Sequence, residues 1–500
     1  MIGALLPLFV AVPLLAAALL VVVPSRTVRA AIVLTVPVGG LVGGGLLVWA
    51  TSQGDVFAHD VGLWSTGIAI PFVVDILSAL MLTATSLLIG ASAWFGVVTG
   101  EDRSPFFPAL VAVLAAGVYG ALLTADVFNL FVFIEVMLLP SYGLIAITGG
   151  WRRLKGGRLY VTVNLLTSTV YLIGVALMYG AAGTVHLGEL AASARESELV
   201  TIAGGVMLIA MLVKAAVVPT HGWLARTYPE TSPTVTALFS GLHTKVAIYA
   251  VYRLYATIFD GDPRFLWVGI AIFSATMLVG VLGAVGENTM RSILVFHMVS
   301  QIGYILLGVA LFTRLGLTAG IFYLIHHMIV KASLFLSTGA LEDTYGTKSL
   351  SEISGVARRQ PLVGAVFIGA ALSLAGMPPF SGFVAKLSLL WGAAEAGEWI
   401  AFAIAIAVSL ITLMSMLKIW AGPFWGGNEP AAGGIRASGV VTTTIEAPPR
   451  VRLAVIAPAL VLTCVTLVLG IAGQGLLALS GQAADNLLDL TAYLEAVNSL

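Results

Sequence analysis

Long apolar runs recur from one end of the sequence to the other, and they constrain the fold more than any other feature. Each run holds about 20 residues, enough for an α-helix to cross the hydrocarbon core of a bilayer. Of the 500 residues, 59% are hydrophobic and only 10% are charged. Spanning backbone must satisfy its own hydrogen bonds, and these runs are too long and too weakly alternating for barrel strands. The sequence therefore predicts an all-α polytopic membrane protein.

The segments between the runs, rich in charge, glycine and proline, indicate about 14 transmembrane helices. We expect them near residues 2–23, 30–50, 72–98, 106–124, 127–148, 161–181, 200–219, 232–257, 265–284, 292–311, 317–340, 362–390, 400–421 and 453–478. The first run resembles a signal peptide, but no basic residue precedes it and PSRTVR follows, so we interpret it as the first helix. The single cysteine, Cys464, excludes an internal disulfide.

Basic residues are distributed unevenly over the connections between these helices. Connections after odd-numbered helices, the odd connections, hold most of the 24 Lys and Arg residues: Arg26, Arg29, Arg103, Arg152, Arg153, Lys155, Arg158, Arg226, Arg291, Lys348, Arg358, Arg359, Arg436, Arg450 and Arg452. The even connections hold only Arg195, Arg264 and Arg314. Because basic loops stay in the cytoplasm, we expect the odd connections on the cytoplasmic side of a bacterial cell membrane and both termini outside. A net charge of zero gives no indication of nucleic-acid binding.

Proline interrupts two of the predicted helices, the seventh and the twelfth, at Pro219, Pro378 and Pro379. The lysines repeat as well, because Lys214 and Lys386 are separated by nearly the same number of residues as Lys245 and Lys418. Matched interrupted helices favour an internal repeat. A repeat of five helices has an odd number of crossings, so its second copy must be inverted in the membrane.

This repeat predicts how the chain is divided. We expect the first three helices in residues 1–105, the first repeat in 106–259 and the inverted repeat in 260–421. Residues 422–451, rich in Gly, Pro and Thr, are typical of a linker, here cytoplasmic. The last helix and a tail occupy 452–500.

Charged side chains inside the predicted helices are the strongest indication of function: Asp75, Glu135, Lys214, Lys245, Arg253, Lys331, Lys386 and Lys418. Each charge at a helix centre costs roughly 2.5–3.5 kcal/mol. Even if half of these side chains extend to an interface, the summed cost of the others is comparable with a typical folding stability of about 5–15 kcal/mol, so a purely structural origin for the whole set is not expected. Arg253 lies near the end of its helix, where we expect its side chain to extend to the interface.

Lys214, in LVKAAVVPTHGWL, stands close to a proline that cannot donate a backbone hydrogen bond. Pro219 should free the carbonyl of Ala215, and polar backbone at membrane depth requires protein or water around it, which favours an internal hydrated cavity. Glu135 is the expected partner of Lys214, and a change in their separation would load or unload a proton. A packing kink and a static ion pair are the structural alternatives.

Histidine and lysine alternate along the later helices. His243 lies two residues before Lys245, and as an alternative it is a satisfied core histidine. In IFYLIHHMIVKASLFL, His327 and Lys331 are four residues apart and share one helix face with Tyr323.

Other polar side chains extend this set. His326 adjoins His327, and His297 in the tenth helix could face this polar group. Histidine suits proton relay because it titrates near neutrality. The paired histidines also raise haem ligation as an alternative, although nothing in the sequence marks a haem pocket.

Three further candidates lie near helix breaks or helix ends. Lys386 follows the proline pair of the twelfth helix and should be central. Lys418, near the cytoplasmic end of the thirteenth helix, has extension to the interface as its alternative. Asp75 comes early in its helix, where the helix N-terminus would favour an acid. The sequence contains no phosphate loop, zinc-ligand pair or serine-nucleophile motif, so we expect no cofactor, no metal and no enzymatic chemistry of its own.

Several segments together resemble a known family: FNLFVFIEVM, LVKAAVVPTHGWL, GLHTKVAIY, HHMIVKASLF and GMPPFSGFVAK. They are similar to the proton-translocating antiporter family shared by Mrp-type Na+/H+ antiporters and the antiporter-like subunits of respiratory complex I. The resemblance covers the third to the thirteenth helix. It implies two inverted five-helix repeats and a central file of polar residues, here Glu135, Lys214, Lys245, His327, Lys331 and Lys386.

The resemblance also implies partners and transported ions. Other hydrophobic Mrp subunits, H+ and Na+ are expected, within a lipid bilayer. Lysine rather than glutamate on the twelfth helix, an end soon after the fourteenth helix, and the wording of the Glu135 motif favour the Mrp branch. A proton-pumping subunit of complex I or of a membrane-bound hydrogenase is the alternative. An anion permease is a weaker one, because no arginine marks the membrane midplane.

Overall fold

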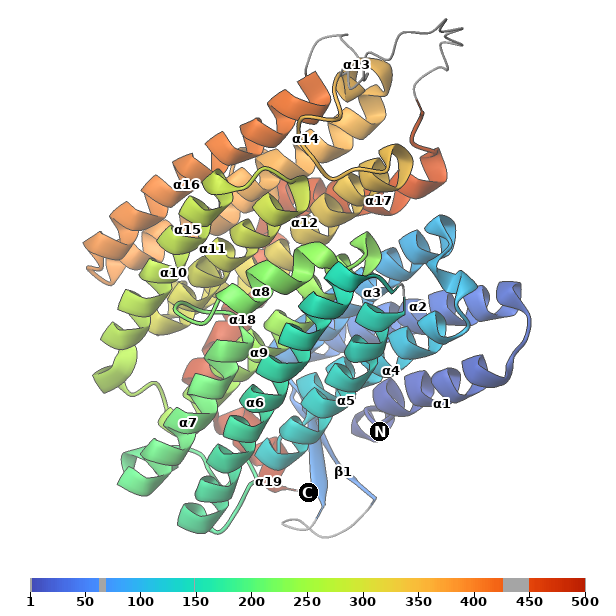
Figure 1. Cartoon of the computed structure of the whole chain (residues 1–500). Coiled ribbons are helices and arrows are strands. Elements are labelled where there is room, and N and C mark those ends of the chain that lie inside the picture. The colour runs from blue at the N-terminus through green and yellow to red at the C-terminus, as the bar shows by residue number, and fades with distance from the viewer. Residues whose placement is uncertain (1, 63–68, 148, 426–448, 500) are drawn as a thin grey trace, which may run out of the picture.

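The structure is a computed structural model that describes residues 2–62, 69–147, 149–425 and 449–499. Its α-helices, shown in Figure 1, are α1 Leu8–Val22, α2 Arg26–Thr51, α3 Ile76–Thr99, α4 Phe106–Leu123, α5 Val127–Ala146, α6 Trp151–Ala182, α7 Glu198–Lys214, α8 Gly222–Thr227, α9 Pro233–Phe259, α10 Leu266–Gly286, α11 Met290–Leu311, α12 Arg314–Tyr345, α13 Val356–Arg359, α14 Pro361–Ala375, α15 Ser381–Glu395, α16 Trp399–Ile419, α17 Leu453–Ile471, α18 Gly473–Leu488 and α19 Thr491–Asn498. Short 3-10 turns are η1 Gly3–Leu5, η2 Glu101–Arg103, η3 Ser193–Arg195, η4 Tyr228–Glu230 and η5 Pro263–Phe265, and a π-turn, η6 Trp420–Trp425, extends α16.

The prediction of a helical polytopic membrane protein is confirmed. Among the described residues, 11 helices are long and apolar enough to cross a membrane. The other predicted spans fall on α9 and on two interrupted pairs, α7 with α8 and α14 with α15. The total of 14 crossings stays a prediction. Most of the predicted linker, at residues 426–448, lies outside the described residues.

A β-hairpin precedes α3, where the sequence predicts a helix that begins at residue 72. Strands β1 Phe57–Val61 and β2 Ile70–Val74 are antiparallel, with Phe57 opposite Val74. The prediction is wrong here because the apolar IPFVV segment matches a buried strand as well as a helix. Helix α3 begins only at Ile76, where the Asp75 side chain caps the helix by accepting from Ser78 N at 2.9 Å.

Both ends of the chain pack beside this hairpin (Figure 1). A Cβ added at Gly3 would lie 2.3 Å from the carbonyl oxygen of Ala58, and α19 contacts both strands. The two termini therefore lie on the same side of the molecule, as an even number of crossings requires.

The two helix breaks differ in where they place lysine. Helix α7 ends at Lys214, and Ala216 has a left-handed φ of 63°. Helix α14 ends at Ala375, Gly376 has a φ of 88°, and Lys386 lies inside the helix that follows. Lys214 thus precedes its break whereas Lys386 follows its own. The nearly equal spacing of the lysines does not mark equivalent positions.

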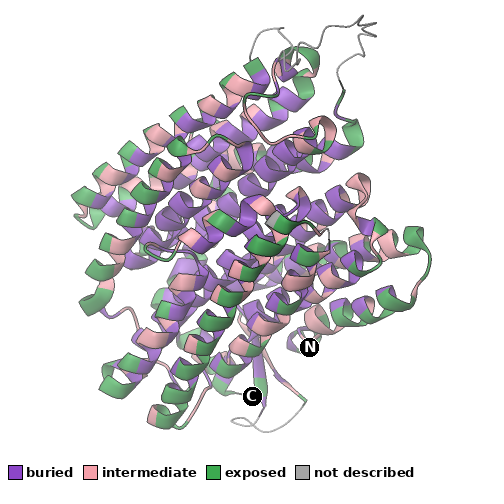
Figure 2. Ribbon diagram, viewed as in Figure 1, coloured by how far each residue is buried: buried purple, intermediate pink, exposed green. Residues whose placement is uncertain are grey.

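Helix α12 occupies the centre of the molecule. It packs against α3, α9, α11, α14, α15, α17 and α18. Every residue in its most apolar stretch is buried. Figure 2 shows buried residues concentrated on these inner helices, while α1, α2, α10 and α16 carry exposed outer faces. Apolar side chains such as Trp49, Trp267 and Met414 are exposed there, as expected of surfaces that face lipid.

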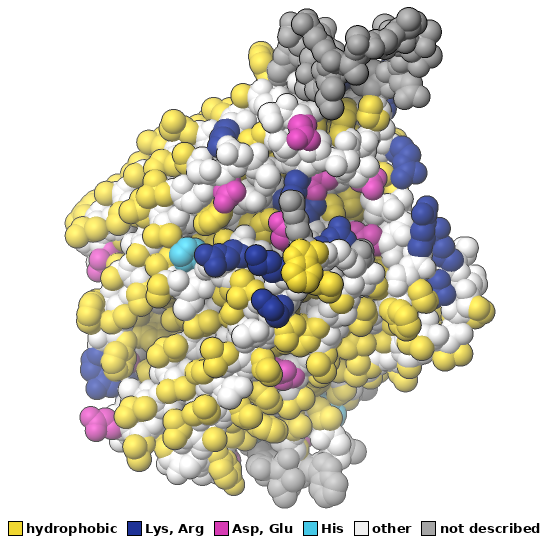
Figure 3. Space-filling model, in the orientation of Figure 1, with side chains coloured by type: hydrophobic (Ala, Val, Ile, Leu, Met, Phe, Trp, Pro, Cys, Tyr) yellow, Lys and Arg dark blue, Asp and Glu magenta, His cyan; other side chains and the backbone are white. Residues whose placement is uncertain are grey.

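Ion pairs between connections show that the predicted helices alternate in direction. Odd connections or the helix ends beside them are joined by Arg26–Asp102 at 2.7 Å, Lys348–Glu230 at 3.4 Å and the pair Arg291–Glu342. Even connections are joined by Arg195–Asp260 at 3.0 Å, and Arg314–Asp485 at 2.6 Å links an even connection to the tail. We call these two sides the odd face and the even face. Figure 3 shows basic and acidic side chains gathered toward the middle and upper right of a largely hydrophobic surface.

Candidate functional site

Four of the lysines predicted inside the membrane are buried in the protein interior. Lys214 is 1% exposed, Lys245 and Lys331 are fully buried, and Lys386 is 5% exposed. They come from α7, α9, α12 and α15, so four separate helices bring ammonium groups into one protein interior. Burial at this level is costly without a function, which makes the set a candidate ion path.

Lys214 donates to the side-chain oxygen of Asn164 on α6 at 3.1 Å. The Asn164 amide is itself held by the carbonyl of Tyr160 at 2.9 Å. Asn164 is not among the residues predicted from the sequence, although a lone asparagine in the apolar YVTVNLL run is a detectable signal. In the described part of the chain, no hydrogen bond or ion pair joins Lys214 to Glu135, whose Oε1 is buried without a partner. The two charges still interact electrostatically.

The backbone around the first break is held by an aromatic side chain. Because α7 stops at Lys214, the carbonyl of Val213 is available to the Trp223 indole, which donates to it at 3.0 Å. The sequence alone instead assigns the freed carbonyl to Ala215. The break itself follows from Pro219 and from the left-handed Ala216.

His243 and Lys245 face different neighbours on α9. His243 shares a hydrogen bond of 2.6 Å with Ser141 of α5, and its ring lies 4.5 Å from that of Phe239. Lys245 donates to the neighbouring hydroxyl of Thr244 at 3.0 Å. Residues two apart on a helix point in different directions, which explains this division.

Helix α12 carries the polar centre. Lys331 donates to the carbonyl of Leu294 on α11 at 2.7 Å. His326 shares a hydrogen bond of 2.8 Å with Ser381 on α15, whereas neither ring nitrogen of the buried His327 has a partner among the described residues. His297 turns to Ser415 of α16 at 2.5 Å, not to the histidine pair.

The second break supplies a ligand for its lysine. Lys386 donates to the carbonyl of Ala375, the last residue of α14, at 2.9 Å and to the hydroxyl of Ser409 at 3.0 Å. Its ammonium also lies 5.4 Å from the centre of the Tyr304 ring. A carbonyl at a helix break thus holds a buried lysine. Ser409 was missed because serine is common in membrane helices.

Electrostatic interactions connect much of the set. Lys214 interacts with His243, Lys245 interacts with His327 and Lys331, and Lys386 interacts with His326. The structure brings together the later members on α9, α12 and α15. Neither a hydrogen bond nor an electrostatic interaction joins Lys214 to Lys245 within the described residues.

Asp75 and Arg253 form a buried ion pair, which corrects the prediction for Arg253. The guanidinium donates to Asp75 Oδ2 at 2.6 Å, and its side chain is 4% exposed, so it does not extend to the interface. The ring of Tyr493 on α19 lies 4.7 Å from it. Sequence reasoning could not pair residues so far apart in the chain. The placement of Asp75 at a helix N-terminus is confirmed.

Lys418 is held at the odd face. Its ammonium donates to the carbonyls of Val285 and Glu287, at 3.0 and 2.6 Å, and so caps the C-terminal end of α10. It lies away from the central group.

No cluster of His, Cys, Asp or Glu that could hold a metal ion occurs in the part of the chain that the structure describes.

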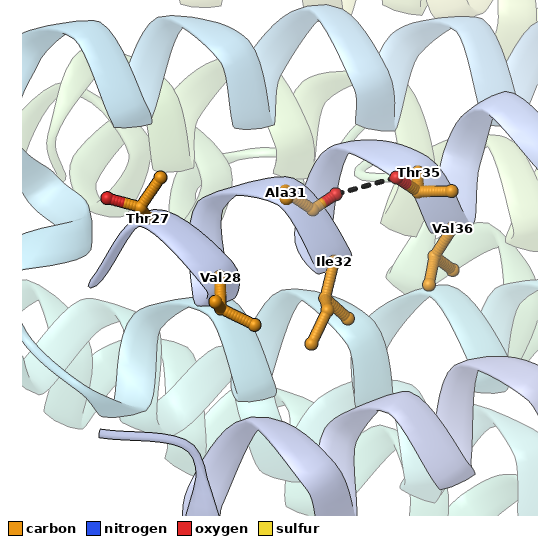
Figure 4. A pocket seen from close by; sticks show the side chains of 6 residues that line it. All are labelled: Thr27, Val28, Ala31, Ile32, Thr35 and Val36. Carbon is orange, nitrogen blue, oxygen red and sulfur yellow. Dashed lines mark hydrogen bonds between the residues drawn. The ribbon is translucent and has the colours of Figure 1, made fainter. Parts of the chain in front are cut away.

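A hollow of about 370 Å³ on α2, shown in Figure 4, is not part of this site. All its lining residues come from one helix, and its hydroxyl Thr35 already donates to the carbonyl of Ala31 at 2.7 Å. The other lining residues are apolar except for Thr27, at the start of the same helix.

Comparison with known proteins defines the class. Residues 124–412 match the transmembrane family of NADH:quinone oxidoreductase and Mrp antiporter subunits. Residues 124–412 include every candidate on α5, α7, α9, α12 and α15. The chain belongs to this family, as its motifs indicate.

Individual relatives show which branch of this family the chain resembles. It is 36% identical to the D-type subunit of the Na(+)/H(+) antiporter of Alkalihalophilus pseudofirmus, over 89% of each chain. A chain in the structure of the Mrp complex from Dietzia sp. DQ12-45-1b is 53% identical, with a TM-score of 0.95 and 99% of both chains covered. The prediction of the Mrp branch is confirmed, and the named relatives within it are D-type subunits. A chain of Thermus thermophilus complex I, 22% identical with a TM-score of 0.81 over 98% and 100% of the chains, shares the fold.

Proposed function

We propose that this chain is the proton-translocating subunit of a multi-subunit Na+/H+ antiporter. The observation that carries the proposal is a set of buried lysines on four helices of a chain whose relatives are named antiporter subunits. A secondary transporter of this kind is not an enzyme. Neighbouring hydrophobic subunits of an Mrp complex would be its partners, and H+ and Na+ its transported ions. No observation favours the respiratory alternative.

Protons pass, in this proposal, from the region of Glu135 and Lys214 to Lys245, then along α12 to Lys386. The side chains His327 and Lys331 supply the α12 steps. Lys214 and Glu135 interact electrostatically but form no ion pair among the described residues. In this proposal, movement of Glu135 toward Lys214 would favour binding of a proton by Lys214. Water has to bridge the remaining separations, above all the one between Lys214 and Lys245.

The same proposal includes the placement in the cell. The odd face lies in the cytoplasm, and both termini lie outside, because the odd connections carry most of the basic residues. Residues 106–259 and 260–421 form the two inverted repeats, preceded by residues 1–105. The linker and the last helix follow.

Replacing Lys214 by Ala in the assembled complex tests the function. We expect Na+-dependent proton exchange in everted membrane vesicles to fall by about tenfold or more, as when a barrier rises by about 1.4 kcal/mol. Lys155→Ala is the matched control, because Lys155 is exposed on the odd-face end of α6. Undiminished exchange in assembled Lys214→Ala complexes would remove the proposal.

A further inference from the structure

A pocket of about 590 Å³ opens on the odd face, apart from the central lysines. Its lining comes from several odd connections and the helix ends beside them, and its charged members are Arg153, Glu230, Arg291, Glu342 and Lys348. Arg291 pairs with Glu342 and donates to the carbonyl of Thr231. Acidic and basic groups together at a hydrated opening suit the collection of protons more than the binding of an anion.

Thr231 lines this pocket and connects it to helix α9. Its hydroxyl shares a hydrogen bond of 2.7 Å with that of Thr236 on α9. From the cap of α9, hydroxyl residues recur every fourth position: Ser232, Thr236, Ser240 and Thr244. Four-residue spacing keeps them along one side of the helix. We call these four residues the hydroxyl row.

The row is buried along its whole length and ends at a candidate site residue. Ser232 is 6% exposed, and Thr236, Ser240 and Thr244 are fully buried. Twelve residues of helix span about 18 Å, which is more than half of the hydrocarbon thickness. At the inner end, the hydroxyl of Thr244 accepts from the Lys245 ammonium at 3.0 Å.

A carboxyl group lies at the outer end of the row. Glu101, in the turn between α3 and α4, accepts from Ser232 at 2.9 Å and from Thr234 at 2.7 Å. Arg153 and Arg291 interact with it electrostatically, but no ion pair within the described residues neutralises it. Burial raises the pKa of this carboxyl above its ordinary value. A group of this kind exchanges protons with the pocket more readily than an ordinary carboxylate does.

We propose that Glu101 and the hydroxyl row form a proton path between the odd-face pocket and Lys245. The inference rests on the proposed proton-translocating function. The path gives Lys245 a route to the odd face that does not pass through Lys214. This matters because no hydrogen bond or electrostatic interaction joins Lys245 to Lys214 within the described residues. Each hydroxyl accepts a proton on an oxygen lone pair and releases its own proton to the next group. One O–H bond forms as another breaks, so every hydroxyl is restored after the transfer. Successive hydroxyls are about 6 Å apart, a distance that one water bridges.

A packing role is the competing explanation, because buried Ser and Thr often donate to the carbonyl one turn earlier. Ser240 donates to the carbonyl of Ala237 at 2.9 Å, and Thr236 to that of Ser232 at 2.9 Å. Valine matches threonine in shape but lacks the hydroxyl. The substitution therefore separates proton relay from packing.

The test uses Thr244→Val in the assembled complex, with Thr244→Ser as the variant that keeps the hydroxyl. Thr257→Val is the matched control, because Thr257 is fully buried on the same helix with a hydroxyl that has no partner among the described residues. We expect Na+-dependent proton exchange in everted vesicles to fall about tenfold in Thr244→Val. It should stay near the wild-type rate in the other two variants. Recovery of the intact complex is measured for each.

Two results would overturn the path: wild-type exchange in Thr244→Val, or an equal loss in Thr257→Val. If Thr244→Val fails to assemble, Ser240→Ala replaces it and is judged in the same way. Lys214→Ala separates this inference from the proposed function. Lost exchange in Lys214→Ala with normal exchange in Thr244→Val refutes the row alone, whereas normal exchange in Lys214→Ala refutes the function.

Discussion

Individual lysines in this protein differ from its buried arginine in what they contact. Lys214, Lys331 and Lys386 each donate to an uncharged oxygen, from an amide, a backbone carbonyl or a hydroxyl. Arg253 instead contacts the carboxylate of Asp75. The Arg253–Asp75 contact adds attraction between opposite charges, which a bond from an ammonium to an uncharged oxygen lacks. This difference is consistent with the proposed proton transfer through the lysines and with a structural role for Arg253.

Replacing Arg253 by Met should destabilise the fold, because it leaves the buried Asp75 carboxylate without its counter-charge. We expect a loss of about 3–5 kcal/mol in the free energy of unfolding. The midpoint of thermal unfolding in mild detergent measures it. Arg314→Met is the control, since its pair with Asp485 is exposed and should contribute only about 0–1 kcal/mol.

A second variant checks the cause. Asp75→Asn combined with Arg253→Met removes both charges but keeps an N-cap for α3, so most of the lost stability should return. If the double variant is as unstable as Arg253→Met, lost packing against Tyr493 explains the effect better than the unpaired charge does.

Among the elements, the interrupted helix of α14 and α15 shows how a break creates a binding group. Gly376 ends α14 with a φ of 88°, and a Cβ there would lie 2.6 Å from Cδ of Lys386. The glycine therefore provides both the left-handed backbone and the space for the lysine stem. The carbonyl of Ala375 then points at the ammonium.

Gly376→Ala should displace Lys386 and lower proton exchange by about tenfold. Gly346→Ala is the matched control, because Gly346 ends α12 with a φ of 71° and has nothing within 4 Å of an added Cβ. Both variants should lose about 1–2 kcal/mol of stability from the left-handed backbone. Equal exchange in the two variants would show that the space around Lys386 is unimportant.

At the scale of the whole molecule, charge separates the two faces. The odd face gathers basic connections and the pocket that leads to α9, and the even face carries both termini with the hairpin. Basic residues resist translocation across the membrane, so their asymmetry decides which face stays inside.

Cysteine labelling tests this orientation. In a Cys464→Ser background, we expect Ser351→Cys to react with an impermeant maleimide only in everted vesicles. Glu196→Cys and Ser499→Cys should react only in intact cells. All three positions are exposed, so access depends on the side of the membrane. Labelling of Ser351→Cys in intact cells would reverse the assignment.

The sequence by itself determined the class of fold, because spanning a bilayer demands long apolar helices whatever their packing. It also drew attention to ionisable residues in apolar runs, and the structure buries Lys214, Lys245, Lys331 and Lys386 among them. The family followed from short segments around Glu135, Lys214, Lys245, Lys331 and Lys386.

Only the tertiary structure decided the partners of those residues. Asn164 replaced Glu135 as the contact of Lys214, Asp75 held Arg253, and a hairpin stood where a helix was expected. A hydrogen bond depends on distances between helices far apart in the chain, and hydropathy carries no information about them. The cost of burying a charge can be read from the sequence, whereas packing alone determines what compensates for it.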